Sequence, residues 1–233
     1  MADEKKYAPS FTIPGRLRYH TVTAQQAFES ATRSDSKLPK NQQPKAVDNA
    51  QASVTLLLGK TTFQSLVTDK FNESADHWEN EGKLDPANRK AFEKYLKGDV
   101  TVDPKAFFST FVFKSVSDMG VPDDEVAKYP AAAVLKQWAG RDITVLAKVS
   151  DDAHLKTQNW DGKQELFPIG ETIFELEPGD LVEARNVTMG VLNGSAKPTL
   201  NLTFNTLVLV RKGTRLGGGG TTEAAEEAAF DEL

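Results

Sequence analysis

Two β-patterned segments near the end of the chain constrain the fold more than any other feature. In residues 199–205, Leu200, Leu202 and Phe204 alternate with polar side chains, a period typical of a strand with one buried and one wet face. The segment before them, 181–192, is also β-patterned, and a polar stretch with glycine and proline separates the two. The sequence therefore predicts an antiparallel hairpin that runs from 181 to 211.

Other elements follow from similar patterns. Strands are predicted over 11–22, 51–58, 107–116, 142–149 and 166–176. Apolar residues at three- and four-residue spacing predict helices over 61–80 and 86–97, with Asp85 as N-cap of the second and Gly98 as its stop. A further helix is predicted over 123–139, with Pro130 starting or kinking a segment within it.

About seven strands with two or three early helices predict a mainly β chain with helical insertions, of class α+β. An OB-fold-like five-stranded barrel fits the count and the short spacing of the later strands, and a β-sandwich is the main alternative. The barrel domain is expected over 1–216, with a helical insertion at about 60–139. Residues 217–233, a Gly-rich linker and an acidic tail, have little capacity to form a core, and we expect them to be disordered.

Charge is divided unevenly along the chain. The net charge is −5, from 28 Lys and Arg against 33 Asp and Glu, and residues 217–233 hold five of the acidic residues and no basic ones. The body is therefore neutral. Within it, residues 1–60 and 197–216 carry local basic surpluses, which are candidate anion-binding surfaces or ordinary solvated faces.

Several function classes find no support in the sequence. The chain has no cysteine and three scattered histidines, and it lacks a Walker loop and a Gly-x-Ser-x-Gly elbow. We therefore predict no enzyme activity, no catalytic residue, no metal site and no cofactor. The longest apolar run, Ala131–Leu135, is far too short to span a bilayer, and the polar start is unlike a signal peptide, so no membrane association and a cytoplasmic location are expected.

Aromatic and basic residues lie close together in the β-patterned segments. Exposed rings can stack on bases while Lys and Arg contact phosphates, which is the usual chemistry of single-strand binding. Packing in the barrel core is the alternative role for each ring. The candidate nucleic-acid-binding residues are Arg16, Arg18, Tyr19, Lys148, Trp160, Lys163, Phe167, Arg185, Lys197 and Arg211.

The β-rich body closes with the segment 201–213, and a glycine run and an acidic tail with Phe230-Asp231-Glu232-Leu233 near its end follow it. This layout resembles bacteriophage single-stranded-DNA-binding proteins, most clearly over residues 140–233 and more weakly over 11–58. It implies an OB-fold protein that coats single-stranded DNA during phage replication, recombination or repair in the host cytoplasm. It also implies a flexible tail that modulates DNA binding and recruits phage or host replication proteins through Glu223, Glu226, Glu227, Phe230, Asp231, Glu232 and Leu233.

Two other functions remain open from the sequence. A virion structural or assembly protein with a partner-binding tail would show no salt-dependent DNA affinity. A metal-dependent nuclease would need convergent carboxylates and histidines, which the sequence does not display. Free hairpin edges permit a homodimer without requiring one.

Overall fold

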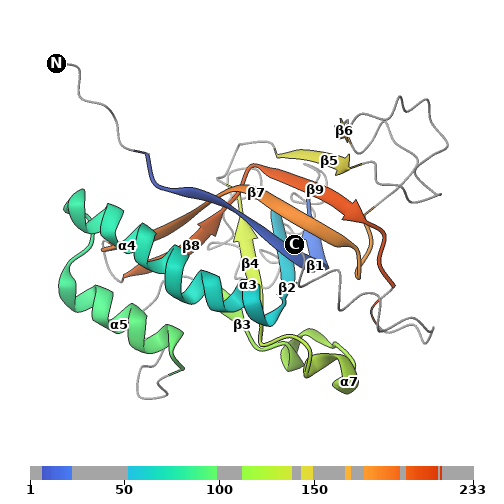
Figure 1. Ribbon diagram of the computed structural model, residues 1–233, viewed down its shortest axis with the longest axis horizontal. Coiled ribbons are helices and arrows are strands. Elements are labelled where there is room, and N and C mark those ends of the chain that lie inside the picture. Colours follow the sequence, from blue (N-terminus) through green and yellow to red (C-terminus); the bar gives the residue numbers. More distant parts are fainter. Residues whose placement is uncertain are drawn as a thin grey trace, which may run out of the picture.

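The computed structural model describes residues 7–22, 52–98, 112–137, 143–148, 166–168, 176–194, 198–214 and 216 (Figure 1). Its strands are β1 (Ser10–Thr21), β2 (Ser53–Leu58), β3 (Phe113–Lys114), β4 (Ala131–Lys136), β5 (Thr144–Lys148), β6 (Leu166–Pro168), β7 (Leu181–Leu192), β8 (Thr199–Thr203) and β9 (Thr206–Arg211). Its helical segments are α3 (Lys60–Ser65), the π-helix η2 (Leu66–Lys70), α4 (Phe71–Asn80), α5 (Pro86–Leu96), the 3₁₀ turn η3 (Ser117–Met119) and α7 (Asp123–Val126).

Five strands close into a barrel. They pair in the order β1–β2–β4–β8–β7, and β7 returns to pair with β1. All contacts around the ring are antiparallel except β4–β8, which is parallel and pairs at Lys136 and Thr203. In chain order the barrel strands are thus first, second, third, fifth and fourth around the ring, which agrees with the predicted OB-like five-stranded barrel rather than a sandwich.

The predicted hairpin over 181–211 is confirmed, and its second arm is divided. Along one edge of β7, residues 181–185 pair with β9 and residues 188–192 pair with β8. The two partners are separated at Phe204-Asn205. Opposite this break, Asn186 has a φ of 53°, a left-handed conformation that asparagine tolerates better than most residues. The bend lets β8 complete the barrel while β9 extends the sheet to β5 and β6 (Figure 1).

The first predicted strand is continuous across its Pro-Gly pair. Pro14 and Gly15 both lie within β1 and pair with β7. At Gly15 a β-carbon would stand 2.8 Å from the β-carbon of Leu56, so glycine allows β1 to approach β2 closely. The strand predicted at 51–58 is also confirmed as β2.

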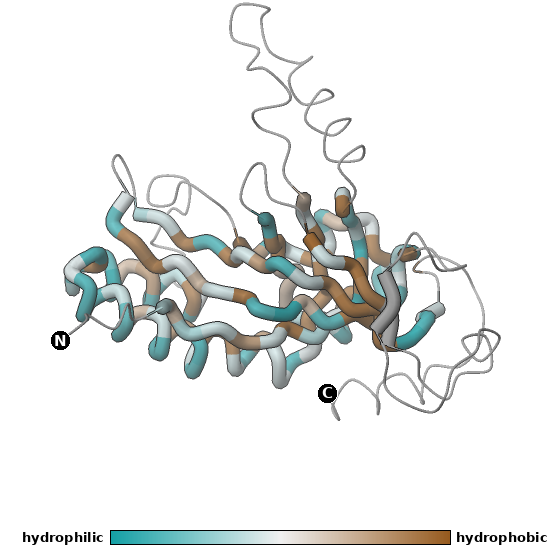
Figure 2. The backbone as a smooth tube through the Cα atoms, turned by 90° about the horizontal axis from the view of Figure 1, so that it is seen from above, coloured by the Kyte–Doolittle hydropathy of each residue, from teal (hydrophilic) through white to brown (hydrophobic). Residues whose placement is uncertain are grey.

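The predicted helices 61–80 and 86–97 are confirmed. The first is α3, η2 and α4 in direct succession, and the second is α5, whose N-cap Asp85 accepts a hydrogen bond from the backbone N–H of Asn88. Trp78 attaches α4 to the barrel by donating to the carbonyl oxygen of Met189, 2.9 Å away. Figure 2 shows the more hydrophilic character of these helices beside the hydrophobic stretches of the strands.

Arg89 joins the two helices α4 and α5. Its guanidinium lies 2.7 Å from Asp76, 2.6 Å from Glu79 and 3.3 Å from Glu93. The pKa of Arg89 is raised above its already high ordinary value, mainly by the hydrogen bond to Asp76. Partial burial of the guanidinium acts in the opposite direction and lowers the pKa, but by less. The pair of helices is therefore held together by ion pairs on its outer side as well as by Phe71 and Phe92 inside.

The helix predicted over 123–139 is wrong beyond its first turn. Among the described residues of this range, 123–137, α7 alone is helical, and residues 131–136 form the barrel strand β4, which lies inside the range expected for the helical insertion. The physical reason is burial on both faces. Ala133 belongs to the inner core and Ala132 to a second cluster on the outer side, so the strand shows an unbroken apolar run instead of alternation.

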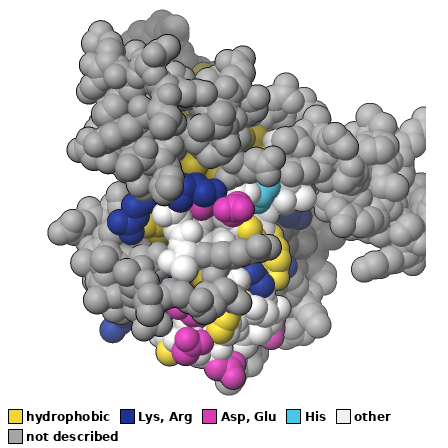
Figure 3. Space-filling view, turned by 90° about the vertical axis from the view of Figure 1, so that its right-hand side faces the viewer, with side chains coloured by type: hydrophobic (Ala, Val, Ile, Leu, Met, Phe, Trp, Pro, Cys, Tyr) yellow, Lys and Arg dark blue, Asp and Glu magenta, His cyan; other side chains and the backbone are white. Residues whose placement is uncertain are grey.

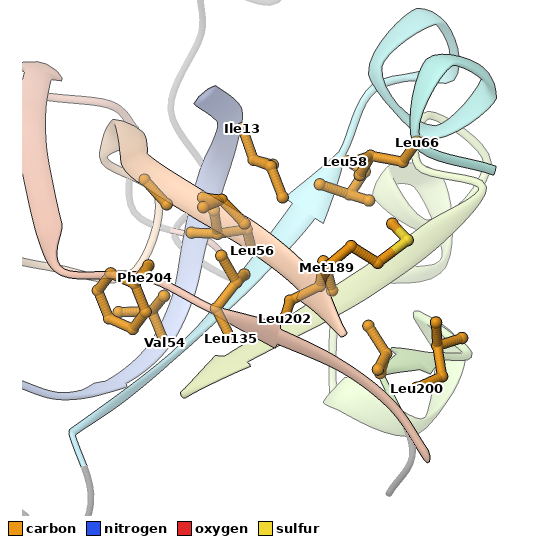
Figure 4. Close-up of a cluster of buried hydrophobic side chains, with 14 of the residues drawn as sticks. Ile13, Val54, Leu56, Leu58, Leu66, Leu135, Met189, Leu200, Leu202 and Phe204 are labelled. Atoms are coloured by element: carbon orange, nitrogen blue, oxygen red, sulfur yellow. The ribbon is translucent and has the colours of Figure 1, made fainter. Parts of the chain in front are cut away.

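Two hydrophobic clusters organise the structure. The inner cluster fills the barrel with side chains from all five strands and from the helices, including Ile13, Leu56, Leu135, Met189 and Phe204 (Figure 4). The outer cluster lies where the segment 112–130 covers one end of the barrel wall. Its members are Leu57, Val116, Met119, Val121, Tyr129, Ala132 and Leu216.

The described residues contain neither a membrane-spanning helix nor a cluster of metal-ligating side chains. None of the helices that the structure describes is long and apolar enough to cross a membrane. Within the same residues, no group of three or more His, Asp or Glu side chains is placed so that it could hold a metal ion.

Candidate nucleic-acid interface

A β-bulge in β1 brings Arg18 and Tyr19 to the same side of the strand. Leu17 pairs with Leu56, and Tyr19 pairs with the very next residue of β2, Thr55, so Arg18 is the extra residue. Bulges of this kind bend a strand and redirect its side chains. As a result, the Arg18 guanidinium carbon lies over the Tyr19 ring, 4.7 Å from its centroid.

One carbonyl group holds both side chains. The Met119 oxygen accepts hydrogen bonds from Arg18 Nε at 2.9 Å and from the Tyr19 hydroxyl at 2.8 Å. Arg18 also donates to the carbonyl oxygen of Gly120, 3.1 Å away. Gly120 ends the turn η3 with a φ of 62°, a conformation that glycine adopts without steric cost. Tyr19 is nevertheless 49% exposed, so its ring is anchored at the hydroxyl while much of it faces solvent.

The strand register defines a surface that we call the outer face of β1–β2–β4. Two transverse rows of side chains form it, one of Tyr19, Thr55 and Val134 and one of Thr21, Ser53 and Lys136. Between these residues the alternating neighbours, such as Val54 and Leu135, point into the core. Apart from Tyr19 and Lys136, which are exposed, the members are half-buried, and Thr21 and Ser53 share a hydroxyl–hydroxyl hydrogen bond of 2.8 Å. This surface consists mainly of small, mostly polar side chains, together with the exposed ring of Tyr19 and the exposed ammonium group of Lys136.

Lys136 supplies positive charge to this face. No ion pair joins its ammonium group to any residue that the structure describes, and it lies at the end of β4, beside the pairing with β8. Lys114 on β3 is also exposed and pairs with Ala132, whose side chain lies on the outer side of β4. Neither lysine was among the candidate residues predicted from the sequence. Lys136 lay in the segment predicted to be helical, and Lys114 lay in the predicted strand 107–116. A strand assignment for 131–136 would have placed Lys136 on the wet face.

Arg16 does not lie on the exposed part of this face. It is 6% exposed, and its guanidinium donates to the carbonyl oxygens of Gly179 and Thr214, to Glu125 and to the Tyr129 hydroxyl at 2.6–3.2 Å. Burial raises the pKa of Tyr129, and the neighbouring Arg16 opposes that rise. These contacts give Arg16 a structural role, so we leave it out of the proposed interface.

The other described candidates lie on the β7–β9–β5–β6 part of the sheet. Arg185 is half-buried and forms an ion pair with Glu183 at 2.6 Å. Arg211 pairs with Leu181 at the end of β9, and the described residues contain no ion pair to it. Where β5 and β6 run antiparallel, the backbone of Lys148 pairs with Leu166 and that of Phe167 pairs with Ala147. The structure thus brings Arg18 and Tyr19 together and places these four residues elsewhere on the sheet.

The remaining predicted residues fall outside the described part of the chain. These are Trp160, Lys163, Lys197 and the tail residues Glu223, Glu226, Glu227, Phe230, Asp231, Glu232 and Leu233, together with the predicted disorder of 217–233.

Charges of both signs occur on the described part of the surface. Figure 3 shows Lys and Arg side chains next to Asp and Glu side chains on one face of the molecule. The segment that covers the outer cluster itself carries exposed Asp118, Asp123 and Asp124.

Comparison with known proteins gives similarity only at the level of structure. No family model and no curated protein matches the sequence. The single-stranded DNA-binding protein from bacteriophage Enc34 is similar at 13% identity and a TM-score of 0.44, covering 95% of this chain and 96% of that one. The same protein in complex with ssDNA gives 14% identity and a TM-score of 0.45, covering 93% of this chain and 100% of that one.

A third similar structure comes from another phage. It is gp2.5, a single-stranded DNA-binding protein encoded by bacteriophage T7, with 14% identity, a TM-score of 0.43 and coverage of 95% of each chain. The structures found are of the class that the C-terminal sequence pattern resembles. Their identities are too low to assign a function, so the function proposed below depends on this chain's own residues.

Proposed function

We propose that this protein binds single-stranded DNA without catalysing a reaction and with little sequence preference. The observation that carries the proposal is the exposed, anchored ring of Tyr19 on the outer face of β1–β2–β4. In OB-folds, the face of the second and third barrel strands binds oligonucleotides. Here those strands are β2 and β4, with Tyr19 directly beside them on β1.

The chemistry of this face suits an unpaired strand. A base can stack on the Tyr19 ring, and every base has a face that can do so, which makes the contact tolerant of sequence. The Tyr19 hydroxyl already donates to Met119 and offers no donor for reading base edges. Lys136, without an ion-pair partner among the described residues, is suited to contact a phosphate. Ser53, Thr55 and Val134 are half-buried, so a DNA strand can approach the barrel wall closely at these positions.

We extend the proposal to the acidic tail. Leu216, the last described residue, belongs to the same buried cluster as Met119, whose carbonyl oxygen holds Tyr19. A tail that begins there with charge −5 can compete with DNA for basic side chains on the outer face. In the free protein it would cover that surface, and bound DNA would release it to recruit other proteins.

The biological setting belongs to the same proposal. By the sequence resemblance, which is clearest over residues 140–233, the protein would act in phage DNA replication, recombination or repair in the host cytoplasm, with phage or host replication proteins as partners of the tail. Trp160, Phe167, Lys148, Lys163, Arg185, Lys197 and Arg211 remain predicted contacts beyond the outer face of β1–β2–β4.

Substitutions on the outer face test the proposed function. Tyr19→Ala should weaken binding to oligo(dT) by about 5–150-fold, because stacking contributes about 1–3 kcal/mol per base. Lys136→Ala should weaken binding. It should also lower the slope of log affinity against log salt concentration by about 0.7, the value expected for one phosphate contact on a single strand. Lys90→Ala, an exposed lysine on the distant helix α5, is the charge-matched control and should change neither. Unchanged affinity in both test variants would contradict this location of the site.

A further inference from the structure

We propose that Arg18 is a positioning residue that orients the Tyr19 ring for stacking, and not a phosphate contact. This inference rests on the proposed function and assigns a different role to a residue that the sequence had suggested as a phosphate ligand. Its basis is the set of contacts that the β-bulge creates between Arg18, Tyr19 and the turn 117–120.

The Arg18 guanidinium is already occupied by protein groups. Its Nε donates to the Met119 carbonyl oxygen at 2.9 Å, and one terminal nitrogen donates to the Gly120 carbonyl oxygen at 3.1 Å. Phosphate recognition by arginine commonly uses two parallel N–H donors of the guanidinium fork. Because one side of the fork is directed at backbone carbonyls, Arg18 is poorly placed to offer that geometry to DNA.

Arg18 also limits which face of the Tyr19 ring a base can stack on. The guanidinium carbon lies over the ring, 4.7 Å from the centroid, so one ring face carries a cation. Cations are attracted to aromatic faces and stack on them. With the hydroxyl held by Met119 and one face covered by Arg18, the ring has a fixed tilt and one face available to a single base.

The shape of the turn supports the same role. At Gly120 a β-carbon would lie 3.4 Å from an Arg18 terminal nitrogen, so the turn packs directly against the guanidinium. Met119 is 7% exposed and belongs to the outer cluster, so the carbonyl that holds both side chains is part of a packed segment. The Tyr19 hydroxyl and the Arg18 guanidinium are therefore both anchored to this segment, each by one hydrogen bond to the same carbonyl oxygen.

The conservative variant Arg18→Lys distinguishes positioning from phosphate contact. A lysine keeps the charge but cannot reproduce the planar, two-carbonyl arrangement. If Arg18 positions the ring, Arg18→Lys should lose affinity for oligo(dT) about as much as Arg18→Ala, about fivefold or more, with the salt dependence of binding unchanged. In the Tyr19→Ala background, Arg18→Lys should have no further effect.

A phosphate contact would give the opposite pattern. Arg18→Lys would then bind nearly as well as the unsubstituted protein, and Arg18→Ala would lower the salt slope by about 0.7, as expected for Lys136→Ala. That pattern would overturn the inference while leaving the proposed function intact. Failure to bind oligo(dT) at low salt, even after removal of residues 217–233, would instead contradict the proposed function, and the positioning role with it.

A measurement on the free protein gives an independent check. NMR should show the side-chain protons of Arg18 shifted upfield by the Tyr19 ring and the Arg18 Nε–H protected from exchange with water. Tyr19→Phe, which keeps the ring, should preserve part of the upfield shift, and Tyr19→Ala should abolish it. Unshifted, rapidly exchanging Arg18 signals in the unsubstituted protein would show that the arrangement does not persist in solution and would overturn the inference.

Discussion

A hydrogen bond of 2.6 Å joins the Arg16 guanidinium, in β1, to the carbonyl oxygen of Thr214, just beyond the end of β9. The same side chain reaches Glu125 in α7 at 3.2 Å and the turn at Gly179 at 3.1 Å. One buried arginine therefore ties together the first strand, the segment that covers the outer cluster and the point from which the C-terminal tail departs.

Replacing Arg16 by methionine should strongly destabilise the fold. Glu125 has only 17% of its side chain exposed, and after the substitution its carboxylate keeps Lys128, 3.3 Å away, but loses the buried arginine. The carbonyl oxygens of Gly179 and Thr214 and the Tyr129 hydroxyl lose the hydrogen bonds that Arg16 donates to them. Losing a buried charge together with its hydrogen bonds should cost about 3–5 kcal/mol. Urea unfolding should show this loss for Arg16→Met, and the double variant Arg16→Met/Glu125→Gln should recover part of it. A loss below about 1 kcal/mol would contradict the structural role of Arg16.

Replacing Gly213 by alanine should also destabilise the protein. A β-carbon at this position would collide with the carbonyl oxygen of Gly179, a backbone atom that cannot move without shifting the turn. Overpacking of this kind costs about 1–3 kcal/mol. Gly190→Ala is the matched control, because its added carbon meets only the end of the Asn201 side chain, which can rotate away. Equal thermal unfolding midpoints for the two variants would argue against the tight approach at Gly213.

Stability should fall at alkaline pH because of two buried phenols. Burial raises the pKa of Tyr95 and of Tyr129 above the ordinary value of 10.0. In the unfolded chain these groups ionise near pH 10, whereas in the folded protein they stay neutral to a higher pH. Their contribution to the free energy of unfolding is therefore full below pH 10 and is lost as the pH rises through the folded-state pKa.

The variant Tyr95→Phe tests the pH dependence, because Tyr129 also accepts a hydrogen bond from Arg16. Urea unfolding between pH 8 and pH 11 should show a shallower alkaline loss for Tyr95→Phe than for the unsubstituted protein. Tyr7→Phe, a change at a side chain that is 85% exposed, is the control for removal of a hydroxyl. An identical alkaline loss in Tyr95→Phe and the unsubstituted protein would contradict the prediction.

Deleting residues 217–233 should raise affinity for single-stranded DNA at low salt. The deletion removes all of the net negative charge, −5, from the end of a neutral body. Because salt screens charge competition, the gain should shrink as ionic strength increases. Titration of labelled oligo(dT) with the full chain and the shortened chain measures the effect, and equal affinities at low salt would exclude competition by the tail.

The parts of the fold with a regular pattern could be predicted from the sequence. The alternation of Leu200, Leu202 and Phe204 identified β8, and the Asp85-Pro86 start and Gly98 stop bounded α5 closely. Strand β4 could not be identified in this way, because Ala132 and Ala133 are buried on opposite faces and the expected alternation is absent. The order of strands around the barrel depends on contacts between distant residues, which periodicity does not encode.

The candidate site could be predicted only in part. Arg18 and Tyr19 were selected because a basic and an aromatic residue are adjacent in the sequence. Their arrangement, however, depends on a β-bulge and on the Met119 carbonyl group, which is 100 residues from Tyr19 in the sequence. Arg16 was selected by the same reasoning as Arg18 and is instead buried by Tyr129, Glu125 and Thr214. Two residues of one type, two positions apart on one strand, thus differ in role because of what covers each of them.

Fluorescence anisotropy of labelled oligo(dT) and of a matched duplex, at about 50 and 200 mM salt, tests the central claim most directly. We predict binding that is selective for the single strand, that weakens by orders of magnitude over this range because several phosphates are contacted, and that Tyr19→Ala impairs. No binding to the single strand at 50 mM salt, even after removal of residues 217–233, would contradict the proposed function and favour a role in virion assembly.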